Sequence, residues 1–498
     1  MSLSRRHRTT LLPVIAFLLV GVLAACGSRM HPDTVARLQG GSPAVPGQAE
    51  AGTGIGTEVV GGGATSTTAT SPIPGAAGTA PQAAPVGGTD RTDGGSTGAD
   101  AAAPAPTGEN AAGGGGEAGG CDGFANQTGI TDTTITIANA SDISGPVPGL
   151  MQAGQDAVRA YAAYFNATSD ICGRKLEVLL LDSRTDAAAD QLAYTKACDE
   201  SFAAVGSMSA FDSGGAATAQ ACGLPDLRSA SASLERSRCT TCFGAMSLKA
   251  NEFENAVPDW IKANHPAGVK KAAYVWINAG AVPANANYQA DAMEQRGLKF
   301  LIRQGIDISE FNYAPYVQEL KDAGIEYVQF LGSSAHAVRM AQAMQQQGYK
   351  PDLFMMSQPM YEQGYIEQAG AAAEDTHIFI THVPFEEASR SPEVSLYLAW
   401  LQQVNPSAKP TSYGLFAWSA ARLFVEQATA LGGKLSRPAL IASLKQVKNW
   451  TANDAHGPQN VGAKRTGECW RFIKVDGGRW TASGARDYSC VGTTTVPE

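Results

Sequence analysis

The sequence has no excess of positive charge: 37 Lys and Arg residues stand against 46 Asp and Glu residues, and the formal net charge is −9. Proteins that bind nucleic acid generally carry a basic face, so we expect no nucleic-acid partner. The same balance gives no reason to expect attachment to a membrane through a basic surface.

Familiar catalytic signatures are also missing. The chain contains no G-x-S-x-G, no H-E-x-x-H and no P-loop pattern, which excludes the usual sites of hydrolases, zinc proteases and nucleotide-binding enzymes. Its few histidines are scattered, and His377 and His382 flank a predicted strand end rather than forming a metal pair. We therefore predict a protein that is not an enzyme and that has no cofactor and no metal site. An unrecognised catalytic site is the alternative.

Aromatic residues are almost absent between positions 28 and 120, where Gly, Ala, Thr, Pro and Ser dominate. Such a segment cannot bury enough apolar surface to offset its ordering entropy, so a disordered linker over 26–120 is predicted. A flexible coil of about 90 residues has an r.m.s. span on the order of 50 Å. The linker would let a folded part move clear of a membrane while staying tethered to it.

The N-terminus lacks an apolar run of the roughly 20 residues that a membrane span needs. Three arginines precede a short apolar run over 11–22, which ends on small residues and Cys26. This order predicts a cleaved signal peptide over 1–25. The stretch "LAAC" resembles the lipobox of bacterial lipoproteins, in which the cysteine becomes the acylated first residue, so the resemblance implies lipidation at Cys26. An ordinary signal peptide with a chance cysteine is the alternative.

Eight further cysteines lie from position 121 onward, and an even set in an exported chain indicates disulfides. The candidates are Cys121, Cys172, Cys198, Cys222, Cys239, Cys242, Cys469 and Cys490. Sequence alone leaves roughly a hundred pairings open. Cys469 and Cys490 flank a predicted terminal hairpin, which makes their pairing plausible. Cys239 and Cys242 form a lone C-x-x-C, and we favour a structural disulfide over a redox or zinc site.

From Thr134 onward, short β-branched runs alternate with longer alanine-rich helical patterns. One series predicts strands at 133–140, 175–183 and 203–208, and a second predicts strands at 271–277, 298–306, 325–332 and 352–357. Strands that are nearly all apolar and alternate with helices predict parallel sheets covered on both faces, hence an α/β fold. Two such series imply two Rossmann-like lobes, with a ligand site beyond the carboxyl ends of their strands.

The stretch from Asp142 to Asp186 carries a family resemblance. It contains Ser144-Gly145-Pro146 after a strand, Asn166 near a helix end, Gly173-Arg174-Lys175-Leu176 entering the next strand, and Asp182 closing it. The order resembles the opening of type I periplasmic binding proteins of the branched-chain amino acid and amide class. The resemblance continues to the terminal "WRFIKVDGGRW" and lies in order and spacing over that length rather than in any one motif.

The resemblance implies two α/β lobes joined by three crossovers, which close around one small molecule by a hinge motion. We expect the first lobe over 121–247 plus about 382–440, and the second over 248–381 plus about 441–498. The crossovers are expected near Gly244 to Ser247, near Thr381 to Pro384, and near the end of the chain. Family members deliver solutes to an ATP-binding-cassette (ABC) permease, so a monomeric receptor anchored by lipid at the outer face of the cytoplasmic membrane is implied.

The resemblance also suggests where a ligand is held. First-lobe candidates are Ser144, Ser209, Phe211, Asp212, Ser229, Ser231 and Ser233, and second-lobe candidates are Tyr288, Ser333, Gln358 and Tyr361. Hydroxyls and exposed backbone amides suit a carboxylate or another polar oxygen, and Phe211 and Tyr361 could stack on a flat ligand. For any single serine, a helix cap or a turn is the competing interpretation.

The chain departs from amino-acid binders of this family after the predicted strand at 352–357. Those proteins usually place an acidic side chain there for the ligand's ammonium group, whereas this chain has Gln358 and Pro359. An amide, a urea-like compound or an aromatic acid is therefore at least as plausible as an amino acid, unless Asp212 pairs with the ammonium. A sensor of the same fold that signals to a membrane partner is the alternative function, and an adhesion or wall-spacing role is a third.

Overall fold

The computed structural model describes residues 119–498. The predicted signal peptide, the lipidation site at Cys26 and nearly all of the predicted linker lie outside the described residues. Among residues 119–498, no helix combines the length and the apolar character that a bilayer crossing requires.

The first lobe is built on a five-stranded parallel sheet in the order β2-β1-β3-β4-β5. Its strands are β1 (Thr134–Ser141), β2 (Lys175–Asp182), β3 (Ala203–Val205), β4 (Asp226–Arg228) and β5 (Cys242–Gly244). The central strands β3 and β4 are buried along their whole length. β3 is entirely apolar, as expected for a strand covered on both faces, whereas β4 buries the charged side chains of Asp226 and Arg228. The parallel sheet predicted for this lobe is confirmed.

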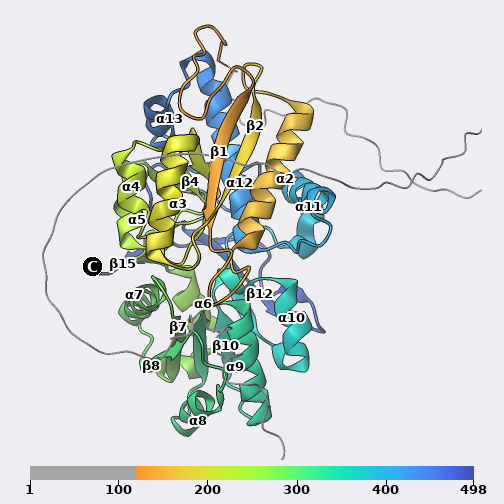
Figure 1. The fold of residues 1–498 in the computed structure, drawn as a ribbon. Coiled ribbons are helices and arrows are strands. Elements are labelled where there is room, and N and C mark those ends of the chain that lie inside the picture. The colour runs from red at the N-terminus through yellow and green to blue at the C-terminus, as the bar shows by residue number, and fades with distance from the viewer. Residues whose placement is uncertain (1–118) are drawn as a thin grey trace, which may run out of the picture. The chain divides into compact units, whose positions relative to one another are not determined.

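Helices cover both faces of this sheet (Figure 1). One face packs against α2 (Gln152–Thr168), α11 (Pro392–Val404), α12 (Ser412–Leu431) and α13 (Arg437–Leu444), and the other against α3 (Ala187–Glu200) and α4 (Ala216–Ala221). The short helix α5 (Leu234–Arg238) precedes β5. Alanines predominate in the second interface, which lets α3 and α4 approach the strands closely.

The second lobe holds an eight-stranded sheet in the order β13-β12-β11-β10-β9-β7-β8, with β14 also pairing with β12. Its strands are β7 (Ala272–Asn278), β8 (Phe300–Asp307), β9 (Tyr327–Leu331), β10 (Leu353–Met356), β11 (His377–Ile380), β12 (Cys469–Val475), β13 (Trp480–Ala482) and β14 (Ser489–Cys490). The strands from β7 to β11 are parallel, whereas β12 runs antiparallel to β11 and β13. A separate two-stranded ribbon pairs β6 (Glu252–Glu254) with β15 (Thr493–Thr495).

Helices again lie on both faces of the second sheet (Figure 1). Core residues of α8 (Ala314–Asp322), α9 (Ser334–Gln346) and α10 (Gln363–Ala369) pack on one face, and those of α6 (Ala256–Asn264) and α7 (Val282–Gln295) pack on the other. The 3-10 helix η2 (Gln358–Met360) follows β10, and η4 (Phe385–Arg390) precedes α11.

Three crossovers join the lobes. The chain passes from β5 to β6 through residues 245–251, and from β11 to η4 through residues 381–384. The third crossover was expected near the end of the chain, but it lies between Val461, in the first-lobe core, and β12. Gln459 ties the first two together, because its Oε1 accepts from Ser247 N at 2.9 Å and its Nε2 donates to Thr381 Oγ1 at 3.3 Å.

The boundary expected at about residue 440 differs from the packing. Leu444, Ala452, Ala455 and Val461 belong to the core of the first lobe. The reason is that α13 and the turns after it pack against α12, so this segment completes the first lobe before the chain crosses to β12.

All eight described cysteines are paired, as Cys121–Cys172, Cys198–Cys222, Cys239–Cys242 and Cys469–Cys490. The two pairings favoured from local spacing are confirmed. Cys469 and Cys490 are joined where β12 lies antiparallel to β14, so backbone pairing brings the two residues opposite each other.

Candidate functional site

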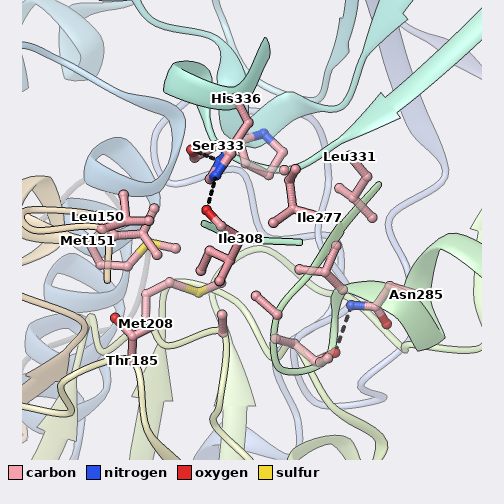
Figure 2. Close-up of a pocket in the computed structure, with 18 of the residues that line it drawn as sticks. Leu150, Met151, Thr185, Met208, Ile277, Asn285, Ile308, Leu331, Ser333 and His336 are labelled. Atoms are coloured by element: carbon pink, nitrogen blue, oxygen red, sulfur yellow. Dashed lines mark hydrogen bonds between the residues drawn. The ribbon is translucent and has the colours of Figure 1, made fainter. Parts of the chain in front are cut away.

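A cavity of about 110 Å³ lies between the lobes, at the carboxyl ends of strands from both sheets. We call it the apolar compartment. Figure 2 shows its wall, in which Leu150, Met151 and Met208 of the first lobe face Ile277 and Leu331 of the second. These side chains can bury the aliphatic or aromatic body of a small molecule, and each buried methylene group contributes about 0.8 kcal/mol.

Two polar side chains of the apolar compartment, Ser333 and His336, are occupied with each other and with the backbone. Ser333 Oγ lies 2.6 Å from His336 Nδ1, and His336 Nε2 lies 3.1 Å from the carbonyl oxygen of Ile308 (Figure 2). The carbonyl can only accept, so Nε2 carries the proton and Nδ1 accepts from the serine hydroxyl. Burial lowers the pKa of His336, which favours the neutral ring.

A second cavity of about 100 Å³ adjoins the first, and we call it the polar compartment. The two share Met208, Ala232, Asn285, Leu331, Pro359 and Tyr413 in their walls, so they are neighbouring parts of one cleft. The polar compartment adds seven polar side chains, those of Ser231, Lys249, Glu252, Glu254, Gln289, Ser357 and Gln358. They stand beside apolar side chains such as Met246, Phe379 and Trp470. A molecule seated across both parts would therefore meet apolar groups at one end and polar groups at the other.

Two hydrogen bonds cross the cleft and hold the lobes together. The backbone N–H of Ala281 donates to the carbonyl oxygen of Ala210 at 2.9 Å, and Asn285 Nδ2 donates to that of Ala232 at 3.0 Å. In both bonds the donor belongs to the second lobe and the acceptor to the first.

Of the first-lobe candidates, Ser231 lines the cleft, in the polar compartment. The other hydroxyls serve the lobe itself: Ser144 donates to Asp182 at 2.5 Å, Ser229 to the carbonyl oxygen of Gly206 at 3.0 Å, and Ser233 accepts from Arg236 N as the N-cap of α5. Ser209 Oγ accepts from the backbone of Phe211, whose half-buried ring lies outside both walls.

Asp212 also serves the first lobe. Its carboxylate accepts from the backbone N–H groups of Ala232 at 2.7 Å and Ser233 at 3.0 Å, and it lies 3.7 Å from Arg228. Asp142 likewise accepts from the N–H of Ala210 at 2.8 Å. Backbone amides that were expected to bind an anionic ligand are thus already bound to the protein's own carboxylates.

Of the second-lobe candidates, Ser333 and Gln358 line the cleft, whereas Tyr288 and Tyr361 do not. Gln358 Nε2 lies 3.0 Å from Met246 Sδ, and its Oε1 accepts from Thr381 N at 2.9 Å, so its amide bridges two crossovers. Tyr361 is fully buried and its hydroxyl donates to Glu386. Tyr288 lies on α7, is half-buried and packs against the core of the second lobe.

Sequence reasoning missed Glu254, Asn285 and the aliphatic wall. Glu254 follows the first crossover in the stretch "NEFEN", where acids alternate with a phenylalanine that packs in the core. That period-2 pattern at the entry of the second lobe was the available signal. Within residues 119–498, no group of three His, Cys, Asp or Glu side chains is arranged to hold a metal ion.

The model of a family described as periplasmic binding protein matches residues 134–479. The chain belongs to this family. The match spans both lobes of this periplasmic binding protein, and the resemblance identified from its sequence is confirmed.

Solved structures agree on the fold. The fatty acid ABC transporter substrate-binding protein from Thermomonospora curvata is 17% identical, with a TM-score of 0.64 over 75% of this chain and 96% of its own. The branched-chain amino acid transporter substrate-binding protein of Streptococcus pneumoniae, solved with isoleucine, is 13% identical, with a TM-score of 0.60 over 72% and 99%. An extracellular ligand-binding receptor from Rhodopseudomonas palustris is 16% identical, with a TM-score of 0.59 over 71% and 100%. A search of curated proteins found no match.

Proposed function

We propose that this periplasmic binding protein captures a small solute in the cleft between its lobes and delivers it to an ABC importer, without chemical conversion. The observation that carries the proposal is the cleft itself, because residues from both lobes line it at the carboxyl ends of their parallel strands. The crossovers beside it, tied by Gln459 and Gln358, are suited to act as the hinge.

The solute has an aliphatic or aromatic body. Support comes from the wall of the apolar compartment, which is mostly aliphatic and where Ser333 and His336 are already hydrogen-bonded within the protein. A ligand made only of hydroxyl groups, such as a sugar, would lose its hydrogen bonds to water there without replacing them. Two structural neighbours are named for fatty acid and branched-chain amino acid transport, which agrees with an apolar body.

The receptor is anchored at the outer face of the cytoplasmic membrane by a lipid on Cys26 and acts as a monomer beside its permease. The order of arginines, apolar run and "LAAC" supports the anchor, and the Gly/Ala-rich stretch that follows it supports a tether. A tether would keep the loaded receptor close to the membrane, and so close to its permease, instead of letting it diffuse away.

A thermal-shift screen of the full-length protein in detergent tests the capture. The panel contains aliphatic and aromatic amino acids, amines, amides and carboxylates of about four to nine carbons, with sugars as the comparison. A solute at 100 times its Kd adds about 2.7 kcal/mol to the free energy of unfolding, which raises Tm by several degrees. We expect shifts from compounds with an apolar body and none from sugars.

A matched pair of variants locates the binding. Leu150→Asp puts a charge into the apolar compartment and should abolish the shift, whereas Leu192→Asp changes a leucine that is 70% exposed on α3 and should preserve it. Binding of sugars alone, or binding that survives Leu150→Asp, would contradict a solute held in this cleft.

A further inference from the structure

Glu254 brings an unpaired carboxyl group to the cleft. It ends β6, its side chain is 2% exposed, and it lines the polar compartment. Its Oε1 is buried and has no hydrogen-bond partner among the described residues. Buried acceptors are normally satisfied, so this atom calls for a donor that the chain itself does not supply.

Glu252, two residues earlier on the same strand, shows what a structural carboxylate looks like here. It accepts from Arg465 Nε at 2.7 Å, from Thr493 Oγ1 at 2.6 Å and from Thr466 N at 3.1 Å. These donors hold the pKa of Glu252 below its usual value despite burial. Glu254 is buried equally deeply without any comparable partner.

Asn285 supplies a second acceptor without a donor. Its Nδ2 donates to the Ala232 carbonyl oxygen, which fixes the orientation of the amide because the reverse orientation would place two oxygens together. Its Oδ1 is buried and has no partner among the described residues. Asn285 borders both compartments.

Few charged or titratable groups accompany Glu254. Lys249 and Glu252 line the same compartment, and Glu252 is neutralised by Arg465. Burial and, to a smaller extent, Glu254 raise the pKa of Tyr274, whose hydroxyl donates to Gln289 Oε1 at 2.6 Å and is therefore already satisfied. Burial raises the pKa of Glu254 to about 8, and no lysine or arginine opposes that rise.

We propose that the cleft selects a solute with an ammonium head, which donates hydrogen bonds to Glu254 Oε1 and Asn285 Oδ1 while its apolar body fills the apolar compartment. The inference rests on the proposed function and specifies its ligand. An ammonium group supplies three donors and a positive charge, which match two orphan acceptors and a buried acid. An anionic head is disfavoured because Asp212 and Asp142 already occupy the nearby backbone amides.

Binding of the ammonium is coupled to loss of a proton. Below about pH 8 the free protein carries Glu254 as the neutral acid, and pairing with a cation favours the carboxylate. The O–H bond of the acid breaks, its proton goes to solvent buffer, and the carboxylate pairs with the ammonium, so charge balances. About one proton should leave for each molecule bound at pH 7.

The test uses four probes that share one branched body and differ in the head: isopentylamine, leucine, 4-methylpentanamide and 4-methylpentanoate. Isothermal titration calorimetry of the full-length protein at pH 7 should give an affinity for isopentylamine at least tenfold tighter than for the amide and the carboxylate. Titrations in two buffers of different ionisation enthalpy should show release of about one proton per molecule of isopentylamine bound.

Glu254→Gln keeps the shape and removes the charge. It should weaken binding of isopentylamine by about 100-fold, as expected when one partner of a buried charge pair is lost, and abolish proton release. Glu319→Gln, at an exposed site on α8, should leave both quantities unchanged. Equal binding to Glu254→Gln and wild type, or binding without proton release, would reject the assignment.

The outcomes also separate this inference from the function beneath it. If the carboxylate or the amide binds more tightly than the amine, the ammonium site is wrong while capture in the cleft stands. If none of the four probes binds, the ammonium site is rejected, and capture is then decided by the wider panel of the thermal-shift screen.

Discussion

The first lobe buries Asp190, Asp212 and Asp226 around two arginines, whereas the second lobe buries Glu254 with no cation against it. Arg236 lies 2.9 Å from Asp226 and 3.0 Å from Asp190, and Arg228 lies 3.5 Å from Asp226. All of these side chains are inaccessible to solvent. The Glu254 carboxyl is equally hidden, and its Oε1, like Asp190 Oδ1, has no hydrogen-bond donor. Unlike Asp190, which lies beside Arg236, Glu254 has no arginine or lysine paired with it among the described residues.

The difference separates two uses of a buried acid. In the first lobe, the charge is balanced inside the fold, so the group stabilises the loops that carry Ala232 and Ser233. In the second lobe, no cation stabilises the carboxylate, so burial keeps Glu254 protonated up to about pH 8 in the empty protein. A buried acid that costs stability in the empty protein is more readily explained by a ligand than by packing.

The largest effect is expected from Asp226→Ala. This change leaves Arg228 and Arg236 in the core without their shared partner, and breaking a buried ion pair costs about 3–5 kcal/mol. Urea denaturation of the ligand-free protein measures the loss. Lys196→Ala removes an exposed pair with Glu200 and should change stability by less than about 0.5 kcal/mol. Equal losses in the two variants would mean that the buried cluster is not structural.

Glu254→Gln should raise the free energy of unfolding relative to wild type at high pH, whereas Asp226→Ala lowers it. Because the pKa of Glu254 is raised to about 8 in the folded state, the folded protein holds more protons than the unfolded chain between about pH 4.5 and pH 8. The contribution of Glu254 to stability is therefore lost as pH rises through that window. Glu254→Gln lacks this pH-dependent loss. The difference in the free energy of unfolding, variant minus wild type, should therefore be about 4 kcal/mol larger at pH 8.5 than at pH 5.

Urea denaturation of both proteins at the two pH values gives this difference. Asp190 and the buried histidines also titrate in the range, but they are common to both proteins and cancel. A variant that is less stable than wild type at pH 8.5 would mean that Glu254 has a structural partner after all, and the contrast between the lobes would fail.

The sequence was informative where structure depends on local pattern. Apolar strands alternating with helices predicted both parallel sheets, and short separations predicted the Cys239–Cys242 and Cys469–Cys490 bonds. The site was less predictable, since the partner of a polar side chain depends on segments far away in sequence. Gln358 lines the cleft, but its amide is bonded to Met246 and Thr381, which are more than 20 residues away in sequence. Glu254 is buried because distant segments such as β15 cover β6.

The smallest effects are expected from substitutions of Ser231 and Ser233, which lie two residues apart in sequence but have different roles in the first lobe. Ser233 caps α5 by accepting from Arg236 N, so Ser233→Ala should lower the free energy of unfolding by about 1 kcal/mol. Ser231 lines the polar compartment, so Ser231→Ala should change stability by less than about 0.5 kcal/mol and affect only binding. Urea denaturation and calorimetry with isopentylamine separate the two. If Ser233→Ala loses binding and Ser231→Ala does not, the ligand contacts the first lobe at the cap of α5 and not at Ser231. The hydroxyl of Ser233 would then be the donor that the first lobe supplies.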